Sequence, residues 1–250
     1  MGDALFVDGF DLSGDVGSLS QISGPMGTED FTPISASAIA RLGLLHDGLL
    51  DFIAFWNPTN LVTTGILDSE HDVLKGRPET DRTVSYYRST VLGAPACSMI
   101  SKQITYDGTR NQDGSLTFGV NTVANGFGLE WGNNLTAGKR TEAAAGNGLS
   151  VDLGAVPISY SFGWAVYLHV FAFTGTSVTV KVQDSADNAT WADVTGAVFT
   201  AATGRTAQRI TGASTTATVR RYLRVVSTGT YSNAVYAVNF IRYEAVGAPR

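Results

Sequence analysis

The stretch that most constrains the fold is Ser161–Thr200, in which two apolar runs flank a short polar segment. The first run is Trp164–Phe173. The second, Ser177–Val182, alternates valines with polar residues, a period of two that is typical of a half-buried strand. The turn-forming residues of Thr174–Thr176 and Asp184–Asn188 predict chain reversals. The stretch therefore predicts an antiparallel β-meander that carries no catalytic groups.

Composition supports a mainly β protein. The chain has 250 residues, enough for one large or two ordinary domains. Glycine is frequent (28 residues) and charged residues make up 16%, as in proteins with many short strands joined by tight turns. The single cysteine, Cys97, excludes an internal disulfide framework. No apolar run reaches membrane-spanning length and the N-terminus does not resemble a secretory signal, so we expect a soluble protein.

The first half of the chain is expected to contain strands and two short helices. Apolar residues at a spacing of three predict a helix over Ala36–Leu45, and acidic residues in a first turn predict a second helix from Asp68–Glu70. Leu49–Trp56 alternates and predicts a strand. Asp107–Gly108 and Asp113–Gly114 are hairpin signals.

The chain is expected to divide into two domains. Residues 139–148 are small and polar and are expected to be a linker, between a first domain at 1–138 and a β-sandwich at 149–250. The first domain has 16 acids and 7 bases, a net charge of −9, and the remainder has 6 acids and 10 bases, a net charge of +4. An acidic first domain would repel a polyanion. Deletion of residues 139–250 is expected to leave a first domain that can still assemble.

The sequence offers little that could perform catalysis. His46, His71 and His169 do not stand at metal-ligand spacing, and each is interpreted as structural. Cys97 is interpreted as a buried small apolar residue. Asp107–Gly114 superficially suggests a calcium loop, but it lacks the central glycine and the terminal glutamate, so a hairpin turn is favoured. We expect neither an enzyme nor a cofactor or metal site.

The one basic cluster of the sequence is Arg220–Arg224. On a strand, Arg220, Tyr222 and Arg224 would share one face. This face is either a solvated surface paired to neighbouring acids, which is the commoner arrangement, or a patch for phosphate or glycan. In a carbohydrate-binding alternative, aromatic residues stack on sugar rings, although large aromatics in a sandwich are more often core. The candidates for such stacking are Trp164, Trp191, Tyr222 and Tyr231.

Several segments resemble a known family. FDLSGDVGSLS, GLLHDGLLDFIAFWN, RTVSYYRSTVLGAPACSMISKQITYDGTRNQDGSL and NGFGLEWGNNLTAGKRT resemble the major tail protein, or tail tube protein, of long-tailed bacteriophages. TGTSVTVKVQDSADNATWADVTGAVFTA and VRRYLRVVSTGTYSNAVYAVNFIRY resemble the β-sandwich appended to such proteins. The resemblance covers nearly the whole chain and rests on strands and turns, without a catalytic signature.

The resemblance implies two packed antiparallel sheets flanked by a short helix, followed by an outer β-sandwich. It implies hexameric rings whose inner strands join into one barrel, stacked into a tube through which DNA passes without specific binding. The expected partners are copies of the chain, the tape measure protein and the tail terminator or tip proteins, with host-surface glycans as candidates for the outer domain and no membrane. The expected location is the virion tail, after synthesis in the host cytoplasm.

The residues that would serve these roles can be named as candidates. Acids that interrupt or begin strands are candidates for the tube lumen: Asp8, Asp11, Asp51 and Asp81. The segment Asn57–Asp81 is a candidate contact between subunits or rings. On the outer domain, the surface-binding candidates are Trp191, Arg220, Tyr222 and Arg224. Two alternatives remain open: a carbohydrate-binding β-sandwich and another virion protein, such as a capsid decoration protein.

Overall fold

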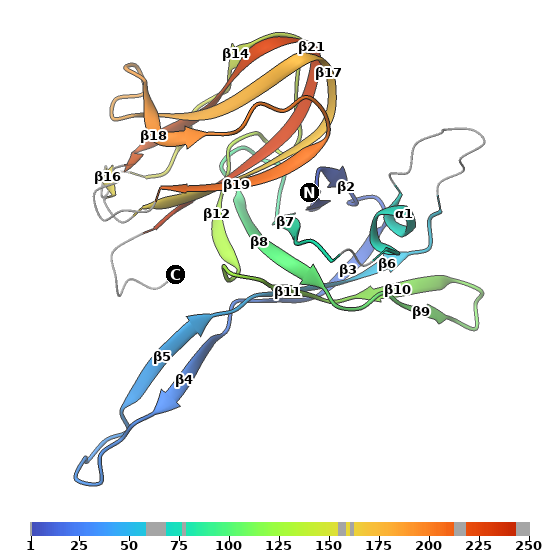
Figure 1. Cartoon of the computed structure of the whole chain (residues 1–250), viewed down its shortest axis with the longest axis vertical. Coiled ribbons are helices and arrows are strands. Elements are labelled where there is room, and N and C mark those ends of the chain that lie inside the picture. Colours follow the sequence, from blue (N-terminus) through green and yellow to red (C-terminus); the bar gives the residue numbers. More distant parts are fainter. Residues whose placement is uncertain are drawn as a thin grey trace. The chain divides into compact units, whose positions relative to one another are not determined.

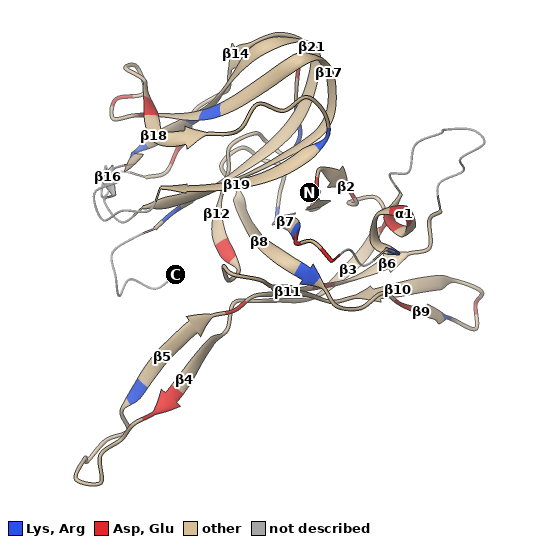
Figure 2. Cartoon of the chain, viewed as in Figure 1, with Lys and Arg blue, Asp and Glu red and all other residues tan. Residues whose placement is uncertain are grey.

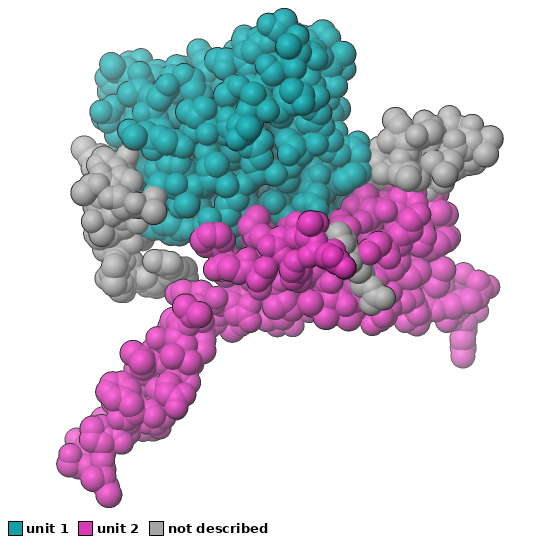
Figure 3. Space-filling view, in the orientation of Figure 1, with its two compact units in different colours: residues 1–13, 83–98, 131–250 teal, residues 14–82, 99–130 magenta. Residues whose placement is uncertain are grey.

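The computed structural model describes residues 2–58, 69–76, 79–154, 159–160, 163–212 and 219–243 (Figure 1). The fold is mainly β, as predicted, and the described residues contain one short α-helix. No helix within these ranges is long and apolar enough to cross a membrane. The chain divides into two compact units (Figure 3). Unit 1 comprises Met1–Ser13, Thr83–Ser98 and Trp131–Arg250, and unit 2 comprises Gly14–Arg82 and Met99–Glu130.

Unit 2 is built on four antiparallel strands in the spatial order β3 (Val16–Ser23), β6 (Leu49–Phe55), β10 (Leu116–Val120) and β9 (Asp107–Arg110). β11 (Thr122–Ala124) continues beside β6 and also pairs with residues 101–103 of β8 (Pro95–Gln103). The predicted strand is present and its alternation is confirmed in part: Leu50, Phe52 and Ala54 are buried, and Ile53 and Phe55 are exposed. Trp56, predicted on the buried side, lies beyond the end of β6 and is exposed, and Asp51 is buried. The Asp113–Gly114 hairpin joins β9 to β10, but Asp107–Gly108 lies inside β9 and makes no turn.

The helix predicted from Asp68–Glu70 is present as α1 (Glu70–Leu74). Glu70 and Asp72 lie in its first turn, where the helix dipole favours acidic residues. Two side chains hold its other end: Arg82 Nη2 donates to the Val73 carbonyl at 2.6 Å, and Gln103 Nε2 donates to the Leu74 carbonyl at 2.7 Å. These bonds satisfy carbonyls that have no partner within so short a helix.

The helix predicted over Ala36–Leu45 is wrong. Part of that segment forms β5 (Arg41–His46), which pairs with β4 (Met26–Asp30) in a separate two-stranded sheet. Gly43 lies inside the predicted helix and disfavours it, whereas pairing with β4 supplies the backbone hydrogen bonds. The apolar residues whose spacing predicted a helix, Ile39, Leu42 and Leu45, are exposed and do not pack against a core. We call residues 26–46 the arm.

Unit 1 is organised around two long strands, β17 (Trp164–Ser185) and β21 (Tyr222–Arg242), which pair along nearly their whole length. The turn predicted at Thr174–Thr176 is wrong. The strands predicted before and after it form one continuous strand, β17. Register shifts near Gly175 absorb the irregularity. A side chain at Gly175 would meet Tyr231 Cα at 2.4 Å, so glycine is needed there for the close approach of the two strands.

The two long strands carry shorter neighbours. β18 (Ala192–Val198) and β19 (Thr206–Gly212) pair with β17. β12 (Glu130–Asn134), β13 (Arg140–Glu142), β14 (Gly146–Asn147) and β15 (Val151–Asp152) pair in turn with β21. β20 (Val219–Arg220) pairs with β16 (Ser159–Tyr160). The expected linker at 139–148 thus supplies two strands, because the backbone of β21 offers it hydrogen bonds.

The N-terminal strands also belong to unit 1. β1 (Ala4–Val7) pairs with β2 (Phe10–Asp11) and with β7 (Arg82–Tyr87). Phe6 and Tyr87 pack in one apolar cluster with Phe171 and Ala237. The units therefore do not follow the expected boundary between 138 and 149. A chain of residues 1–138 would hold all of unit 2 but only fragments of unit 1.

Candidate assembly surfaces

The arm is the most exposed apolar feature of unit 2. Within the described part of the chain its strands pair only with each other, and their side chains are exposed throughout. The exposed fractions reach 109% for Ile34 and 89% for Leu45. An isolated two-stranded hairpin is marginally stable in water, and a large apolar patch marks an interaction site. The exposed apolar residues of the arm are Met26, Phe31, Ile34, Ile39, Leu42, Leu44 and Leu45. Figure 3 shows the arm extended away from the rest of unit 2.

Local hydrogen bonds order the end of the arm. The Thr32 amide donates to Asp30 Oδ1 at 2.9 Å, and the Ala40 amide donates to Thr32 Oγ1 at 2.8 Å. The Phe31 amide donates to the Ala40 carbonyl at 3.1 Å. The hydroxyl and amide of Thr32 also lower the pKa of Asp30. The arm is therefore a formed hairpin, and residues 31–40 carry no charge.

The sheet of unit 2 has two candidate edges for pairing. Among the described residues, β3 has registered partners only in β6, and β9 only in β10. An unpaired strand edge presents amides and carbonyls that another chain can use. Two apolar side chains of β6 are exposed between these edges: Ile53 is 39% exposed and Phe55 is 51% exposed. The ring of Phe55 lies over Gly17, where a Cβ would come within 2.7 Å of it.

Two of the four lumen candidates lie in unit 1 and serve local structure. Asp8 Oδ1 accepts from the Thr83 amide at 2.7 Å, and Asp8 adopts a positive φ of 49° at the turn between β1 and β2. Asp11 forms an ion pair with Lys139, and its Oδ1 accepts from the Ser13 amide at 3.1 Å. Burial raises the pKa of Asp11, but the bonds to Lys139 and Ser13 outweigh it and leave the pKa lowered.

The other two candidates lie in unit 2. Asp51 is buried in β6, and its Oδ1 accepts from the Thr122 amide at 3.1 Å. Asp81 is exposed and forms an ion pair with Lys102 at 2.7 Å, and it also accepts from Asn125 Nδ2 at 3.0 Å. The structure does not bring the four acids together within either unit. Most of the segment Asn57–Asp81 lies outside the described residues, which here include 69–76 and 79–81.

The charge asymmetry expected between domains persists when the chain is divided by its units. Unit 2 carries 13 acids and 6 bases, a net charge of −7, whereas unit 1 carries 9 acids and 11 bases, a net charge of +2. Figure 2 shows the positions of the described charges. The acidic surplus thus belongs to the unit that also carries the arm and the two sheet edges.

The basic cluster and its neighbours form pairs on the sheet of unit 1. The Arg224 guanidinium lies 4.3 Å from the centre of the Trp191 ring and donates to Gln183 Oε1 at 2.7 and 2.9 Å. The Arg220 amide donates to Asp184 Oδ2 at 2.9 Å. Arg221 forms two hydrogen bonds with Asp152, at 2.6 and 2.7 Å, and lies over the ring of Tyr222. On the face that Arg220, Tyr222 and Arg224 were expected to share, the Arg220 guanidinium lies 3.8 Å from Asp184, and Arg224 contacts Trp191 and Gln183.

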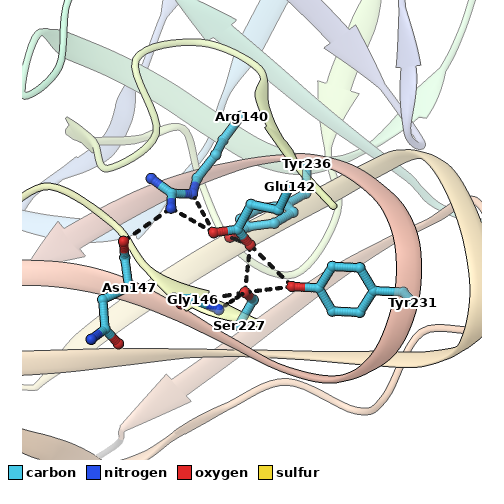
Figure 4. A network of polar contacts seen from close by, with 7 residues as sticks. All are labelled: Arg140, Glu142, Gly146, Asn147, Ser227, Tyr231 and Tyr236. Carbon is cyan, nitrogen blue, oxygen red and sulfur yellow. Dashed lines mark hydrogen bonds and ion pairs between the residues drawn. The ribbon is translucent and has the colours of Figure 1, made fainter. Parts of the chain in front are cut away.

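A buried polar network in unit 1 was not predicted from the sequence (Figure 4). The Glu142 carboxylate accepts from the hydroxyls of Tyr236 at 2.7 Å and Ser227, and from Arg140 Nε at 2.8 Å. Burial raises the pKa of Glu142, but these donors outweigh it and hold the pKa below its usual value. The Tyr231 hydroxyl lies 2.7 Å from Ser227 Oγ. The network fastens β13 to β21.

A second buried network is centred on His169, which the sequence indicated as structural. The Gly9 amide donates to Nδ1 at 3.1 Å, so that nitrogen is an acceptor and Nε2 carries the proton. Nε2 lies 2.9 Å from Ser85 Oγ, which in turn lies 2.7 Å from Ser98 Oγ. Burial lowers the pKa of His169 to about 3, so the ring is neutral. Within the described ranges no group of three or more His, Cys, Asp or Glu residues could hold a metal ion.

Comparisons with known proteins give no sequence relatives. No family model matches the chain, and no curated protein matches it. Among solved structures, the chain is similar to SPP1 Dit (gp 19.1), described as a paradigm of the hub adsorption apparatus in phages that infect Gram-positive bacteria. That match covers 97% of this chain and all of the other, with 11% identity and a TM-score of 0.34.

A second solved structure is the phage P2 baseplate in its activated conformation with Ca. The match covers 98% of this chain and all of the matched chain, with 10% identity and a TM-score of 0.34. At these values neither likeness carries an argument. The function is therefore argued from this chain's own residues.

Proposed function

We propose that the chain is a structural subunit of a bacteriophage tail, which assembles with copies of itself into hexameric rings that stack into a tube for DNA. The observation that carries the proposal is the construction of unit 2. Among the described residues, its four-stranded sheet has two edges without registered partners, and its arm exposes a group of apolar side chains. The sequence resemblance to tail tube proteins supports the same assignment. The proposed role is structural, without catalysis or a cofactor.

The strand directions favour closure into a ring. β3, β6, β10 and β9 alternate in direction, so β3 and β9 run antiparallel to each other. In a cyclic ring all copies of β3 run the same way, and β9 of one copy would meet β3 of the next in antiparallel orientation. Each seam then has the same pattern as the sheet itself, and no edge remains open.

The arm would complete each seam. Its exposed apolar side chains would be covered by an adjacent copy, which would add burial to the backbone pairing at the seam. Assembly would thereby stabilise a hairpin that is marginal by itself.

The acidic surplus of unit 2 suits a passage for DNA, because negative charge repels phosphates and prevents adhesion. The further partners proposed are the tape measure and the terminator or tip proteins of a tail. Unit 1 would decorate the assembly. A carbohydrate-binding role is less well supported, because the Arg224 guanidinium covers one face of Trp191.

Cysteine cross-linking tests the seam. Ser20→Cys in β3 and Thr109→Cys in β9 place thiols on the two proposed edges, with Ser18→Cys and Arg110→Cys as register alternatives. Oxidation of the purified protein should give a ladder up to the hexamer on a non-reducing gel, and negative-stain images should show rings. The native Cys97 is buried, so we expect it to form no cross-links between chains.

The matched control combines Ser20→Cys with Thr228→Cys, an exposed position on β21 of unit 1. This pair should give no ladder. Rings that form without β3–β9 cross-links at any register would reject the proposed seam. A chain that stays monomeric at high concentration and forms no rings would reject the proposed function.

A further inference from the structure

The first turn of α1 holds a buried carboxyl group that lacks a full set of partners. Glu70 is 0% exposed, and its Oε1 has no hydrogen-bond partner among the described residues. Its Oε2 lies 3.4 Å from the Tyr106 hydroxyl, which lies 2.9 Å from His71 Nδ1. A buried ionised oxygen without a donor is costly, whereas the carbonyl oxygen of a neutral acid tolerates that position better.

Among the described residues, no cation forms an ion pair with Glu70. Asp15, in the turn before β3, accepts from the Glu70 amide at 3.2 Å through Oδ2 and from Asn57 Nδ2 at 2.7 Å through Oδ1. On α1 itself, Lys75 is paired with Asp72 at 2.6 Å. From β7, Arg82 reaches the Val73 carbonyl. Burial raises the pKa of Glu70 to about 7, and the negative charge of Asp15 also raises it, against a lowering by the Tyr106 hydroxyl.

A proton on Glu70 would allow a chain of hydrogen bonds from Glu70 through Tyr106 to His71. Protonated Oε2 can donate to the Tyr106 oxygen, and the Tyr106 hydroxyl can donate to His71 Nδ1. Burial and the nearby Lys75 lower the pKa of His71, so its ring is neutral near pH 7 and Nδ1 can accept. Loss of the proton reverses the first bond, so that the Tyr106 hydroxyl donates to Glu70 Oε2, and it places a second negative charge beside Asp15.

We infer that docking of the first turn of α1 is proton-linked: Glu70 is a neutral acid in the docked helix, and its ionisation loosens that turn. The opening is confined to the N-terminal end, because Arg82 and Gln103 hold the carbonyls of Val73 and Leu74. The inference concerns unit 2 alone and does not depend on the proposed function. If that function holds, the switch lies within residues 57–81, the candidate contact segment.

The direction of the pH dependence follows from linkage. The pKa of Glu70 is about 7 when the turn is docked, against 4.5 for a glutamate exposed to solvent, so the docked state binds more protons between pH 4.5 and 7. Opening of the turn should therefore increase as pH rises from 5 to 7, by up to about tenfold per pH unit, and level off above pH 7.

Hydrogen exchange tests this prediction. Amide protection in residues 70–74 should fall between pH 5 and 7, after correction for intrinsic exchange, in the wild-type chain. Glu70→Gln, which mimics the neutral acid, should remove the dependence, and Asp72→Asn on the same helix should retain it. Protection that changes equally in the wild type and Glu70→Gln would overturn the inference.

A second measurement does not depend on a variant. Carboxyl ¹³C titration by NMR of the wild-type chain should give a Glu70 midpoint at about pH 7. A midpoint below pH 5 would overturn the inference whatever the exchange data show. Neither result depends on ring formation, so failure here and failure of the proposed function are distinguishable.

Discussion

The two units differ in how completely each buries its own apolar residues. Unit 1 contains the cluster in which Trp164, Tyr236 and Phe240 pack with the valines of β17, all of them nearly inaccessible to solvent. Of the sixteen large apolar side chains exposed in the described part of the chain, twelve belong to unit 2 and four to unit 1. Unit 1 thus buries its large apolar side chains more completely within its own fold, whereas unit 2 leaves more of them exposed. Apolar exposure of this kind indicates where a partner is expected.

The largest expected effect tests the incomplete unit. Leu42→Asp together with Leu45→Asp places two charges on the arm, and burial of unpaired charge against a second copy is strongly unfavourable. We expect complete loss of rings by electron microscopy and sedimentation, with unfolding of the monomer unchanged. Leu149→Asp changes an exposed leucine of unit 1 and is the control. Persistence of rings in the arm variant would show that the arm is not an assembly surface.

The next effect tests the self-contained unit. Glu142→Ala removes the acceptor shared by Tyr236, Ser227 and Arg140, and should lower the free energy of unfolding by about 3 kcal/mol. Urea denaturation followed by tryptophan fluorescence measures the loss. Glu29→Ala, at an exposed position on the arm, should change the unfolding free energy little. An equal effect of both changes would contradict the difference between the units.

A pH dependence should distinguish the units further. His169 has a folded pKa of about 3, below its unfolded value, so the unfolded chain binds more protons when the pH falls below about 6.5. Unit 1 should therefore lose up to about 1.4 kcal/mol per pH unit from this residue between pH 6.5 and 3. His169→Gln should reduce the slope of unfolding free energy against pH. An unchanged slope would show that His169 is not buried in its neutral form.

The smallest effect concerns the surface of unit 1. Arg224→Ala removes the guanidinium that lies on Trp191 and should cost about 0.5–1 kcal/mol. Trp191→Ala should cost a similar amount, and the double variant should cost less than the sum. Additive costs in denaturation would show that the two side chains do not support each other.

The sequence predicted local structure best where one face of an element is buried within the chain. The alternation of Leu50, Phe52 and Ala54 identified β6, and the run Asp68–Glu70 identified the start of α1. The arm was predicted wrongly because Ile39, Leu42 and Leu45 have no core in the monomer against which a period could be read. Apolar periodicity indicates the secondary structure of a segment when one face of that segment packs against a core, and the arm has no such face among the described residues.

Long-range contacts could not be predicted from the sequence. Ser227 and Glu142 are 85 positions apart, and no local signal indicates that their side chains meet. The same holds for the pairing of β13 and β14 with β21, which turned an expected linker into part of a sheet. The prediction of a turn at Gly175 was wrong because glycine is needed there for the close approach of the backbones of β17 and β21. Of the candidate surface residues, Trp191 and Arg224 do meet, although they are far apart in sequence.

The three-segment construction of unit 1 has a consequence for biogenesis. β1 is synthesised early, but its unit also requires β21, residues 222–242, which is made more than two hundred residues later. Unit 2 lies wholly before that point and can form while unit 1 still awaits its central strand. A nascent chain on the ribosome therefore holds the unit with more exposed apolar side chains before the other unit is complete. Translation speed and chaperone access during that interval would then influence how many subunits reach assembly intact.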